Sequence, residues 1–397
     1  MTTPYLPNHI GNRLPNKDSH SSKKVAHLPS SLNTSLSPIA SAVKVSLVGL
    51  VGLSLVHGAA QAATIQVTSN SDDSTNNANC TLREAITAFN SPSSLPLSSD
   101  NNASVTLTTG CVLTGTASSD DTITFSPNLP NNTIVLNQGE LEITENADVT
   151  INASTIDGGI IVDGDNSFRV FDIYGATVSI DSLTITNGSH LFGTGGGGGL
   201  FADSYASVEV KNSTVSNNTV AIPARGGGGI EVNSSSSVTL INSLVEGNTA
   251  YGSSGGGGIR AARDSTLVLI DSTVNNNTAQ PINGFGGSGG GIVAGGSSLE
   301  LQNSVVSNNM ASSNGGGIDA VSVRSFVIAN STVTNNITSR DGGGIGLGGP
   351  SGVFNSGITY ELTNSTVSNN TAGRSGGGIH IIGRLNINID NLSLIHI

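Results

Sequence analysis

Short stretches in which hydrophobic and polar residues alternate recur along most of the chain. Six of them share an apolar alternation followed by Asn-Ser or Asp-Ser and then by Val-x-x-Asn. They occupy residues 208–218, 238–248, 267–277, 299–309, 326–336 and 360–370, and a diverged copy occupies 178–188. Period-two alternation is typical of a strand with one buried face, so each segment predicts β-structure rather than helix.

A second pattern, a run of glycines that ends in one apolar residue, alternates with these segments. The closing residues are Leu200, Ile230, Ile259, Ile292, Ile318, Ile345 and Ile379. The two patterns together repeat about every 30 residues, with two strand-like pieces and no helix, which predicts one coil of a parallel β-helix per repeat. Crossover chirality favours the right-handed form. We therefore expect an all-β, right-handed, single-stranded parallel β-helix.

Stacking of such coils places individual side chains. Val208 and Val210 should point inward and Glu209 outward, and equivalent residues should form ladders along the axis. The residue before each recurring serine gives an Asn/Asp ladder of Asp181, Asn212, Asn242, Asp271, Asn303, Asn330 and Asn364. Asparagine tolerates left-handed backbone angles, and stacked amides hydrogen-bond to one another, so we expect this ladder to be structural.

Residues 121–175 lack these signatures but keep the alternation. Six stretches predict diverged coils: 121–125, 132–136, 141–146, 149–154, 160–164 and 168–173. Residues 91–120 are rich in Ser and Asn and predict a loop.

The beginning of the chain has the order of a secretory signal peptide. A polar region with several basic residues precedes the apolar run 45–56, and Ala60-Gln61-Ala62 fits the small-x-small cleavage pattern. A retained membrane anchor is the alternative, but the apolar run is shorter than the about 20 residues that a spanning helix needs. We expect cleavage between Ala62 and Ala63.

Cys80 and Cys111 are the only two cysteines. An even pair in an exported chain favours a disulfide, worth roughly 3 kcal/mol in the chain-entropy model, over the alternative of two unpaired buried thiols. Just after Cys80, Thr81 and Glu84 have the spacing of a capping box, and an amphipathic pattern predicts a short helix. A disulfide-linked helix would cap the first coil of an otherwise open-ended stack.

Two resemblances agree with this interpretation. The segment Cys80-Thr-Leu-Arg-Glu-Ala resembles the Cys-Ser-Leu-Arg-Glu-Ala signature at the start of many exported bacterial β-helix proteins. Residues 178–379 are similar to the repeats of the polymorphic outer-membrane protein family, the passengers of autotransporters, in which Gly-Gly-Ala-Ile alternates with Phe-x-x-Asn. Valine stands here at the phenylalanine position, and the matching asparagines are Asn218, Asn248, Asn277, Asn309, Asn336 and Asn370. The resemblances imply a pectin-lyase-like β-helix and an adhesive role.

The chain therefore divides into four parts. Residues 1–62 form a signal peptide, 63–120 an N-terminal cap with disulfide and loop, and 121–391 the β-helix, with clear repeats over 176–391. Residues 392–397 resemble the translation of a sequencing adapter, which suggests a non-native tail on a truncated chain. A missing C-terminal region could then supply association with the outer membrane.

Composition narrows the function. The formal net charge is −12 with only 11% charged residues, which argues against nucleic-acid binding because phosphate neutralisation needs a basic surface. Regularly spaced hydrophobic residues argue against disorder.

The residues that follow each glycine-run ending form an outward row of Glu231, Arg260, Val293, Asp319, Gly346 and His380. Glu231 and Asp319 would lie about 14 Å apart, beyond the 5 to 9.5 Å that glycosidase carboxyl pairs need. Glu231 and Arg260 should form a surface ion pair worth under about 1 kcal/mol. Asp163, Asp165 and Arg169 are the nearest approach to a lyase-like cluster, but they lack the pattern of a calcium loop. We predict no catalytic, cofactor-binding or metal-binding residue.

The sequence as a whole predicts an exported, non-catalytic surface or extracellular protein of a Gram-negative bacterium. It would be an adhesin-like passenger or an envelope stalk, with a glycan or a host protein as its surface ligand and no cofactor. The alternative is a polysaccharide lyase or glycoside hydrolase whose site lies in loops or in the missing C-terminal part.

Overall fold

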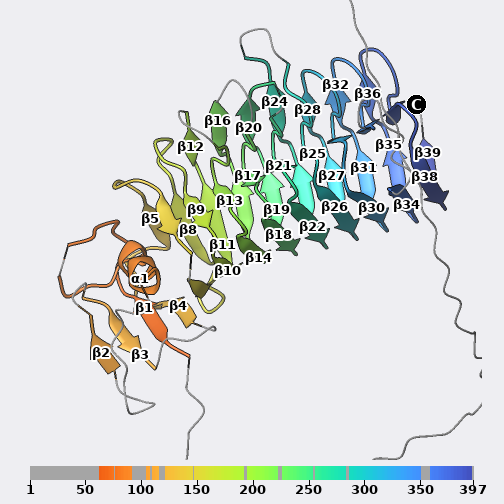
Figure 1. The fold of residues 1–397 in the computed structure, drawn as a ribbon. Coiled ribbons are helices and arrows are strands. Elements are labelled where there is room, and N and C mark those ends of the chain that lie inside the picture. Colours follow the sequence, from red (N-terminus) through yellow and green to blue (C-terminus); the bar gives the residue numbers. More distant parts are fainter. Residues whose placement is uncertain are drawn as a thin grey trace, which may run out of the picture. The chain divides into compact units, whose positions relative to one another are not determined.

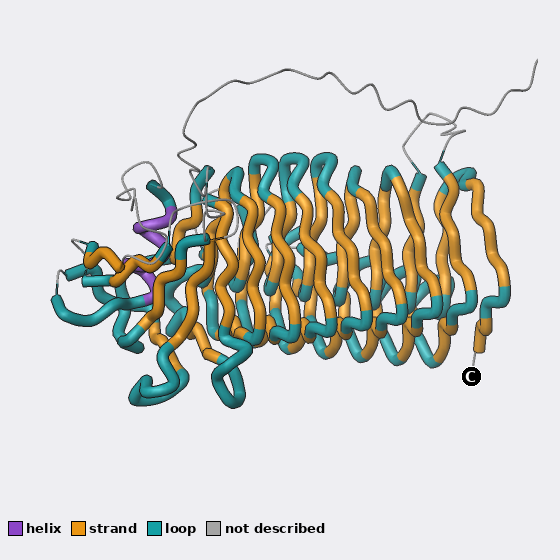
Figure 2. The backbone as a smooth tube through the Cα atoms, turned by 90° about the horizontal axis from the view of Figure 1, so that it is seen from below, coloured by secondary structure: helices purple, strands orange, loops and turns teal. Residues whose placement is uncertain are grey.

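The protein is an all-β parallel β-helix (Figure 1). The computed structural model describes residues 62–75, 77–91, 104–107, 110–115, 121–145, 147–191, 195–221, 226–253, 255–282, 286–349 and 358–395. The predicted signal peptide, apart from Ala62, lies outside these residues. Successive coils stack side by side and give about nine turns (Figure 2). The right-handed sense stays a prediction.

Four sheets run along the stack, numbered here in the order in which a complete coil visits them. Among the described residues the first sheet has thirteen strands: β2 (Ser104–Thr106), β3 (Val112–Thr114), β1 (Thr64–Val67), β4 (Asp121–Phe125), β7 (Asp148–Asn152), β10 (Thr177–Asp181), β14 (Ser207–Lys211), β18 (Ser237–Ile241), β22 (Thr266–Ile270), β26 (Ser298–Gln302), β30 (Ser325–Ala329), β34 (Thr359–Thr363) and β38 (Asn386–Asp390).

The described part of the second sheet has ten strands: β5 (Thr133–Val135), β8 (Ile160–Asp163), β11 (Leu183–Thr186), β15 (Thr214–Ser216), β19 (Leu244–Glu246), β23 (Thr273–Asn275), β27 (Val305–Ser307), β31 (Thr332–Thr334), β35 (Thr366–Ser368) and β39 (Ser393–Ile395). The third sheet has seven short strands in the same residues: β12 (Ser189–His190), β16 (Thr219–Ala221), β20 (Thr249–Tyr251), β24 (Thr278–Gln280), β28 (Met310–Ala311), β32 (Ile337–Thr338) and β36 (Thr371–Ala372).

Nine described strands form the fourth sheet: β6 (Leu141–Ile143), β9 (Phe171–Tyr174), β13 (Leu200–Asp203), β17 (Ile230–Val232), β21 (Ile259–Ala262), β25 (Ile292–Gly295), β29 (Ile318–Val321), β33 (Ile345–Gly348) and β37 (Ile379–Ile382). The apolar residue that ends each glycine run begins a strand of this sheet, as at Ile230.

A complete coil therefore has four strands, such as β14–β15–β16–β17, where the sequence pattern indicated two strand-like pieces. The difference arises because the alternating segment turns twice. Asn212 and Asn217 both adopt left-handed backbone angles, with φ of 48° and 55°, so the motif of residues 208–218 contains strands of two sheets and ends just before a strand of the third.

The expected inward and outward positions are confirmed. Val208 and Val210 are buried in the core, whereas Glu209 between them is only half-buried. β14 pairs in parallel with β10 and β18, and Val208 is in register with Val178 and Val238. The core is thus a stack of equivalent apolar rungs, each of which covers the next.

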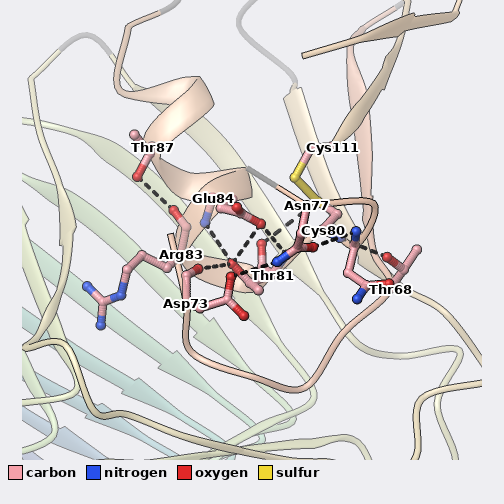
Figure 3. The surroundings of a disulfide bond; sticks show 10 residues. Thr68, Asp73, Asn77, Cys80, Thr81, Arg83, Glu84, Thr87 and Cys111 are labelled. Atoms are coloured by element: carbon pink, nitrogen blue, oxygen red, sulfur yellow. Dashed lines mark hydrogen bonds between the residues drawn. A yellow bond between two sulfur atoms is a disulfide. The ribbon is translucent and has the colours of Figure 1, made fainter. Parts of the chain in front are cut away.

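The N-terminal cap contains the one helix among the described residues, α1 (Leu82–Phe89). Thr81 and Glu84 form the predicted capping box, and Cys80 is disulfide-bonded to Cys111 (Figure 3). Arg83 binds Asp72 through its Nε at 2.7 Å and donates hydrogen bonds to the carbonyl oxygens of Gly139 and Glu140. The helix is therefore joined both to the preceding loop and to the first coil.

The prediction that residues 91–120 are a loop is wrong in part. β2 and β3 pair antiparallel with each other, and β3 pairs antiparallel with β1.

The diverged coils were predicted correctly, since β4 to β9 fall on the six alternating stretches. β39 pairs in register with β35. No described helix has the length and apolar character needed to cross a membrane.

Candidate functional site

Three of the buried ionisable side chains, Glu231, Arg260 and Asp319, lie on the outer face of the fourth sheet. Register places one row along it, defined here as the ionisable row: Glu142, Asp172, Phe201, Glu231, Arg260, Val293, Asp319, Gly346 and His380. The sequence indicated the part from Glu231 to His380. The structure extends the row to the capped end of the stack.

The glycine runs pack over this row, although it faces away from the core. A methyl group at Gly196 would lie 2.1 Å from Oε2 of Glu231, and one at Gly315 would lie 2.6 Å from Cβ of Asp319. Only glycine allows the backbone to approach the row this closely, and Gly315 also has a φ of +61°. The runs thus cover an outward row of side chains.

The expected surface ion pair between Glu231 and Arg260 is present but buried. Nη1 of Arg260 lies 2.6 Å from Oε1 of Glu231, and the two residues are 6% and 2% exposed. The estimate of under 1 kcal/mol for a surface pair is therefore wrong for this site. Removal of one partner would leave the other charge buried and unpaired. In other proteins such a change lowers the free energy of unfolding by several kcal/mol.

A cavity of about 730 Å³ lies where α1 faces the first coils and is called the cap cavity here. Its lining includes Arg83, Glu140, Glu142, Phe168, Arg169 and His190. A large concave site with convergent polar groups is the default place for a ligand.

Arg169 organises the wall of the cap cavity. Its Nη1 binds Oδ2 of Asp172 at 2.8 Å and Oε2 of Glu140 at 3.2 Å, and its Nε donates to the carbonyl oxygen of Gly197. The guanidinium also stacks 4.8 Å from the ring centroid of Phe201. Nη2 is buried and has no hydrogen-bond partner among the described residues.

Burial shifts the pKa values of the acid–base groups around Arg169. It raises the pKa values of Glu140 and Asp172, and the charge of Arg169 only partly opposes the shift. Burial, aided by Arg169, lowers the pKa of His190 to about 4. His190 is therefore neutral near pH 7, and its buried Nε2 has no partner among the described residues.

The sequence had grouped Arg169 with Asp163 and Asp165, but the structure shows no such cluster in the described residues. Asp163 accepts hydrogen bonds from Nδ2 of Asn187 and from the backbone N–H of Asp165, so it ends β8 and stabilises the turn that contains Asp165. The carboxylates that contact Arg169 come from strand β9 and from the residue just before β6. Only the register of the coils brings them together.

A smaller cavity of about 180 Å³ lies between β13, β17 and β21 and is called the β17 pocket here. It is lined by Gly195, Phe201, Asp203, Glu231, Asn233, Arg260 and Arg263. Asp203 Oδ1, Glu231 Oε2 and Asn233 Oδ1 are buried there without a hydrogen-bond partner among the described residues. Each unpartnered acceptor lowers the free energy of unfolding by about 1 to 3 kcal/mol unless a donor forms a hydrogen bond with it.

Asp319 lines a third cavity, of about 330 Å³, with Arg260, Ser288, Val293 and Val321. Burial raises the pKa of Asp319 to about 6, and a hydrogen bond with Ser288 partly opposes the shift. The folded chain therefore holds this proton at pH values where the unfolded chain has released it, so stability falls as pH rises from about 4 to 6.

We expect Asp319→Asn to raise the free energy of unfolding by about 2 kcal/mol at pH 7, because it removes the buried charge. Below pH 4 the carboxyl is protonated in both states, so the gain should disappear. Urea denaturation at pH 7 and at pH 3.5 measures the difference. An equal gain at both pH values would show that titration of Asp319 is not the cause.

The recurring asparagines form two ladders. The ladder predicted from the sequence lies at an exposed turn, where Asn242 donates to Asn212 and Asn212 donates to Asp181. One assignment needs correction: register pairs Asp181 with Lys211, so Ser182, which is left-handed like Asn212, is the equivalent position. In the diverged segment Asp181 follows Ile180 directly, whereas Lys211 separates Val210 from Asn212, and the alignment therefore slipped by one residue.

A second, buried ladder contributes more hydrogen bonds. Its members are Asn218, Asn248, Asn277, Asn309, Asn336 and Asn370. In each step the amide oxygen of the later asparagine accepts from both the backbone N–H and Nδ2 of the earlier one, as Asn309 does from Asn277. The sequence had singled these residues out only through the Val-x-x-Asn resemblance.

The fold and these ladders define a parallel β-helix protein with a capped end. No protein-family model matches the chain, and neither a curated protein nor a solved structure is significantly similar to it. The similarity to polymorphic outer-membrane protein repeats therefore stays an interpretation of the sequence.

Proposed function

We propose that this protein is an exported, non-catalytic surface protein, adhesin-like or stalk-like, that binds a glycan on the outer face of its fourth sheet. The N-terminal segment with its Ala60-Gln61-Ala62 pattern supports export, and the paucity of basic residues supports a surface that does not bind nucleic acid. A β-helix is compatible with a surface or extracellular protein.

The β17 pocket is the observation that carries the binding role. Glu231 and Asn233 lie two residues apart on one side of the chain. Val232 is in register with Ala202, so the residues that follow them, Asn233 and Asp203, are neighbours on adjacent coils. Their three unpartnered oxygens accept hydrogen bonds only. Hydroxyl groups of a sugar supply the donors that Asp203 and Asn233 lack, whereas the backbone at Gly196 covers Oε2 of Glu231.

Charge and size favour a neutral sugar over an ion. Two carboxylates, Asp203 and Glu231, are balanced by two guanidinium groups, Arg260 and Arg263, around the same pocket. No three His, Cys, Asp or Glu side chains of the described residues are placed to hold a metal ion. A volume of about 180 Å³ is below the range of about 300 to 1,000 Å³ of drug-sized sites and suits a single pyranose ring.

A binding assay with the full chain tests the proposal. Neutral oligosaccharides of several linkages are titrated by calorimetry, with calcium chloride and sodium sulfate as ion probes. We expect at least one neutral glycan to bind, and Asn233→Ala to weaken it about tenfold, the effect of one lost hydrogen bond. Glu246→Gln on β19 is the matched control and should change nothing. If only an ion binds, and Asn233→Ala abolishes that binding, the result would contradict the proposal that the β17 pocket binds a glycan.

One observation favours a second candidate, a glycoside hydrolase beside the cap cavity, which is lined by Glu140 but not by Asp172. Glu140 and Asp172 share Nη1 of Arg169, so their bound oxygens are no more than about 6 Å apart, near the about 5 to 5.5 Å of retaining glycosidases. Both pKa values are raised, as a general acid requires. However, the shared guanidinium occupies the space between them, which suits a fixed ion pair better than two independent catalytic groups.

Turnover decides between the two candidates. The full chain is incubated with a panel of neutral and acidic polysaccharides, and reducing ends and unsaturated uronates are measured. We expect neither product. Release of reducing ends that is abolished by both Glu140→Gln and Asp172→Asn, but not by Glu246→Gln, would establish the hydrolase instead.

A further inference from the structure

The first residue after the predicted cleavage site is already held in the fold. Ala63 is fully buried, and its backbone nitrogen donates a hydrogen bond to Oδ1 of Asp121 at 3.0 Å. Asp121 is the first residue of β4 and is only 3% exposed. A buried carboxylate therefore lies against the atom that cleavage between Ala62 and Ala63 would turn into the amino terminus.

Strand pairing fixes the position of that nitrogen independently of Ala62. The carbonyl oxygen of Ala63 accepts a hydrogen bond from the backbone N–H of Thr122 at 2.8 Å. β1 then runs parallel to β4 from the next residue, with Thr64 in register with Thr122. Removal of the preceding chain leaves all of these contacts in place.

Cleavage changes the charge at this contact. Hydrolysis of the peptide bond adds one water, leaves a carboxylate on Ala62 and gives Ala63 an α-amino group, which takes up a proton at neutral pH. A neutral amide donor is thereby replaced by an ammonium group at hydrogen-bond distance from a carboxylate. Charge-assisted hydrogen bonds are about twice as strong as neutral ones, and a buried charge is stabilised chiefly by an opposite charge.

We propose that Asp121 is the docking site for the mature amino terminus, and that signal-peptide removal completes a buried ion pair between the α-ammonium group of Ala63 and this carboxylate. The pair joins the first strand to the first coil. The proposal rests on the proposed export only for its cleavage step, because the geometry of Ala63 and Asp121 is independent of where the protein resides.

The composition of the mature chain gives a selective probe. Lys211 is the only lysine after residue 62, so Lys211→Arg leaves the α-amino group as the single primary amine. In a chain beginning at Ala63, we expect an amine-reactive ester to label this group at least tenfold more slowly than it labels the urea-unfolded chain. Asp121→Asn should restore most of the reactivity, whereas Glu361→Gln, on β34 of the same sheet, should not.

A stability cycle tests whether the charge matters. The unfolding equilibrium is measured for chains that begin at Ala63 and for chains that keep residues 1–62, each with and without Asp121→Asn. We expect the substitution to raise the unfolding constant at least tenfold more in the chains that begin at Ala63. An equal effect in both, or equal labelling rates with Asp121 and with Asn at this position, overturns the ion pair.

Sequencing the amino terminus of the exported protein separates the two proposals. Ala63 at the first position supports both. A different first residue in an exported protein overturns the docking of Ala63 and leaves export intact. A protein that is retained in the cell with residues 1–62 overturns the proposed export. The labelling result for the chain that begins at Ala63 still decides whether the ion pair with Asp121 forms.

Discussion

Asn277→Ala is expected to lower the free energy of unfolding by about 4 kcal/mol, the largest effect of a single substitution that we predict. Nδ2 of Asn277 donates to the carbonyl oxygen of Val245 and to Oδ1 of Asn309. Its Oδ1 accepts from both the backbone N–H and Nδ2 of Asn248. Alanine leaves these partners in a buried rung without water to replace the amide.

The exposed ladder supplies the matched control. Asn242 also donates to the equivalent residue of the preceding coil, Asn212, but it lies at the surface with a φ of 48°. Asn242→Gly keeps the left-handed turn and lets water replace the lost hydrogen bond, so we expect a loss below about 1 kcal/mol. Urea denaturation monitored by circular dichroism measures both variants. Equal losses would show that burial does not distinguish the two ladders.

The sequence was sufficient to predict a stack of β-coils, although not the four strands of each coil, because its signals are local and repeated. An inward valine at 208 is followed by another at 210, and each later coil repeats the pattern at the same distance from its asparagine. Agreement among the coils therefore supports each assignment, except in the diverged coil, where Asp181 was assigned to a position that Ser182 occupies. In residues 91–120 no repeat exists to correct the interpretation, and the short strands β2 and β3 were missed.

The alternation of hydrophobic and polar residues did not predict that the ionisable row is buried. Period two correctly places Glu231 on the outer side of its strand, and solvent is the usual environment there. What buries it is the glycine run of the preceding coil, where Gly196 passes directly over the carboxylate. The glycines were recognised as a repeat, but their role as a cover depends on the path of the chain between two sheets.

The cap cavity shows a different limit. Glu140, Arg169 and Asp172 belong to diverged coils in which no asparagine or glycine signature gives the register. Their association follows from the pairing of β6 with β9, which places Glu142 beside Asp172. Without that pairing, Arg169 was grouped with the acids nearest in sequence. Pairs of charges are found reliably from sequence only where the repeat itself supplies the register, as for Glu231 and Arg260.

Removal of the disulfide is expected to have the second-largest effect. The double variant Cys80→Ala/Cys111→Ala should lose about 3 kcal/mol of unfolding free energy, because the bridge closes a loop with a sequence separation of 31. The loss should be concentrated at the capped end of the stack. There Arg83 still joins α1 to the carbonyl oxygens of Gly139 and Glu140, so the helix should remain attached but exchange its amide hydrogens faster.

Hydrogen exchange with and without dithiothreitol measures this effect region by region. The reductant should shift the wild-type chain to the behaviour of the double variant and leave the double variant unchanged. Protection in β1, β4 and α1 should fall, while strands such as β22 and β26, several coils away, should keep theirs, since each coil contacts only its neighbours. A uniform loss of protection along the stack would mean that the cap and the coils unfold as one cooperative unit, and that the disulfide stabilises the whole stack rather than its first layer.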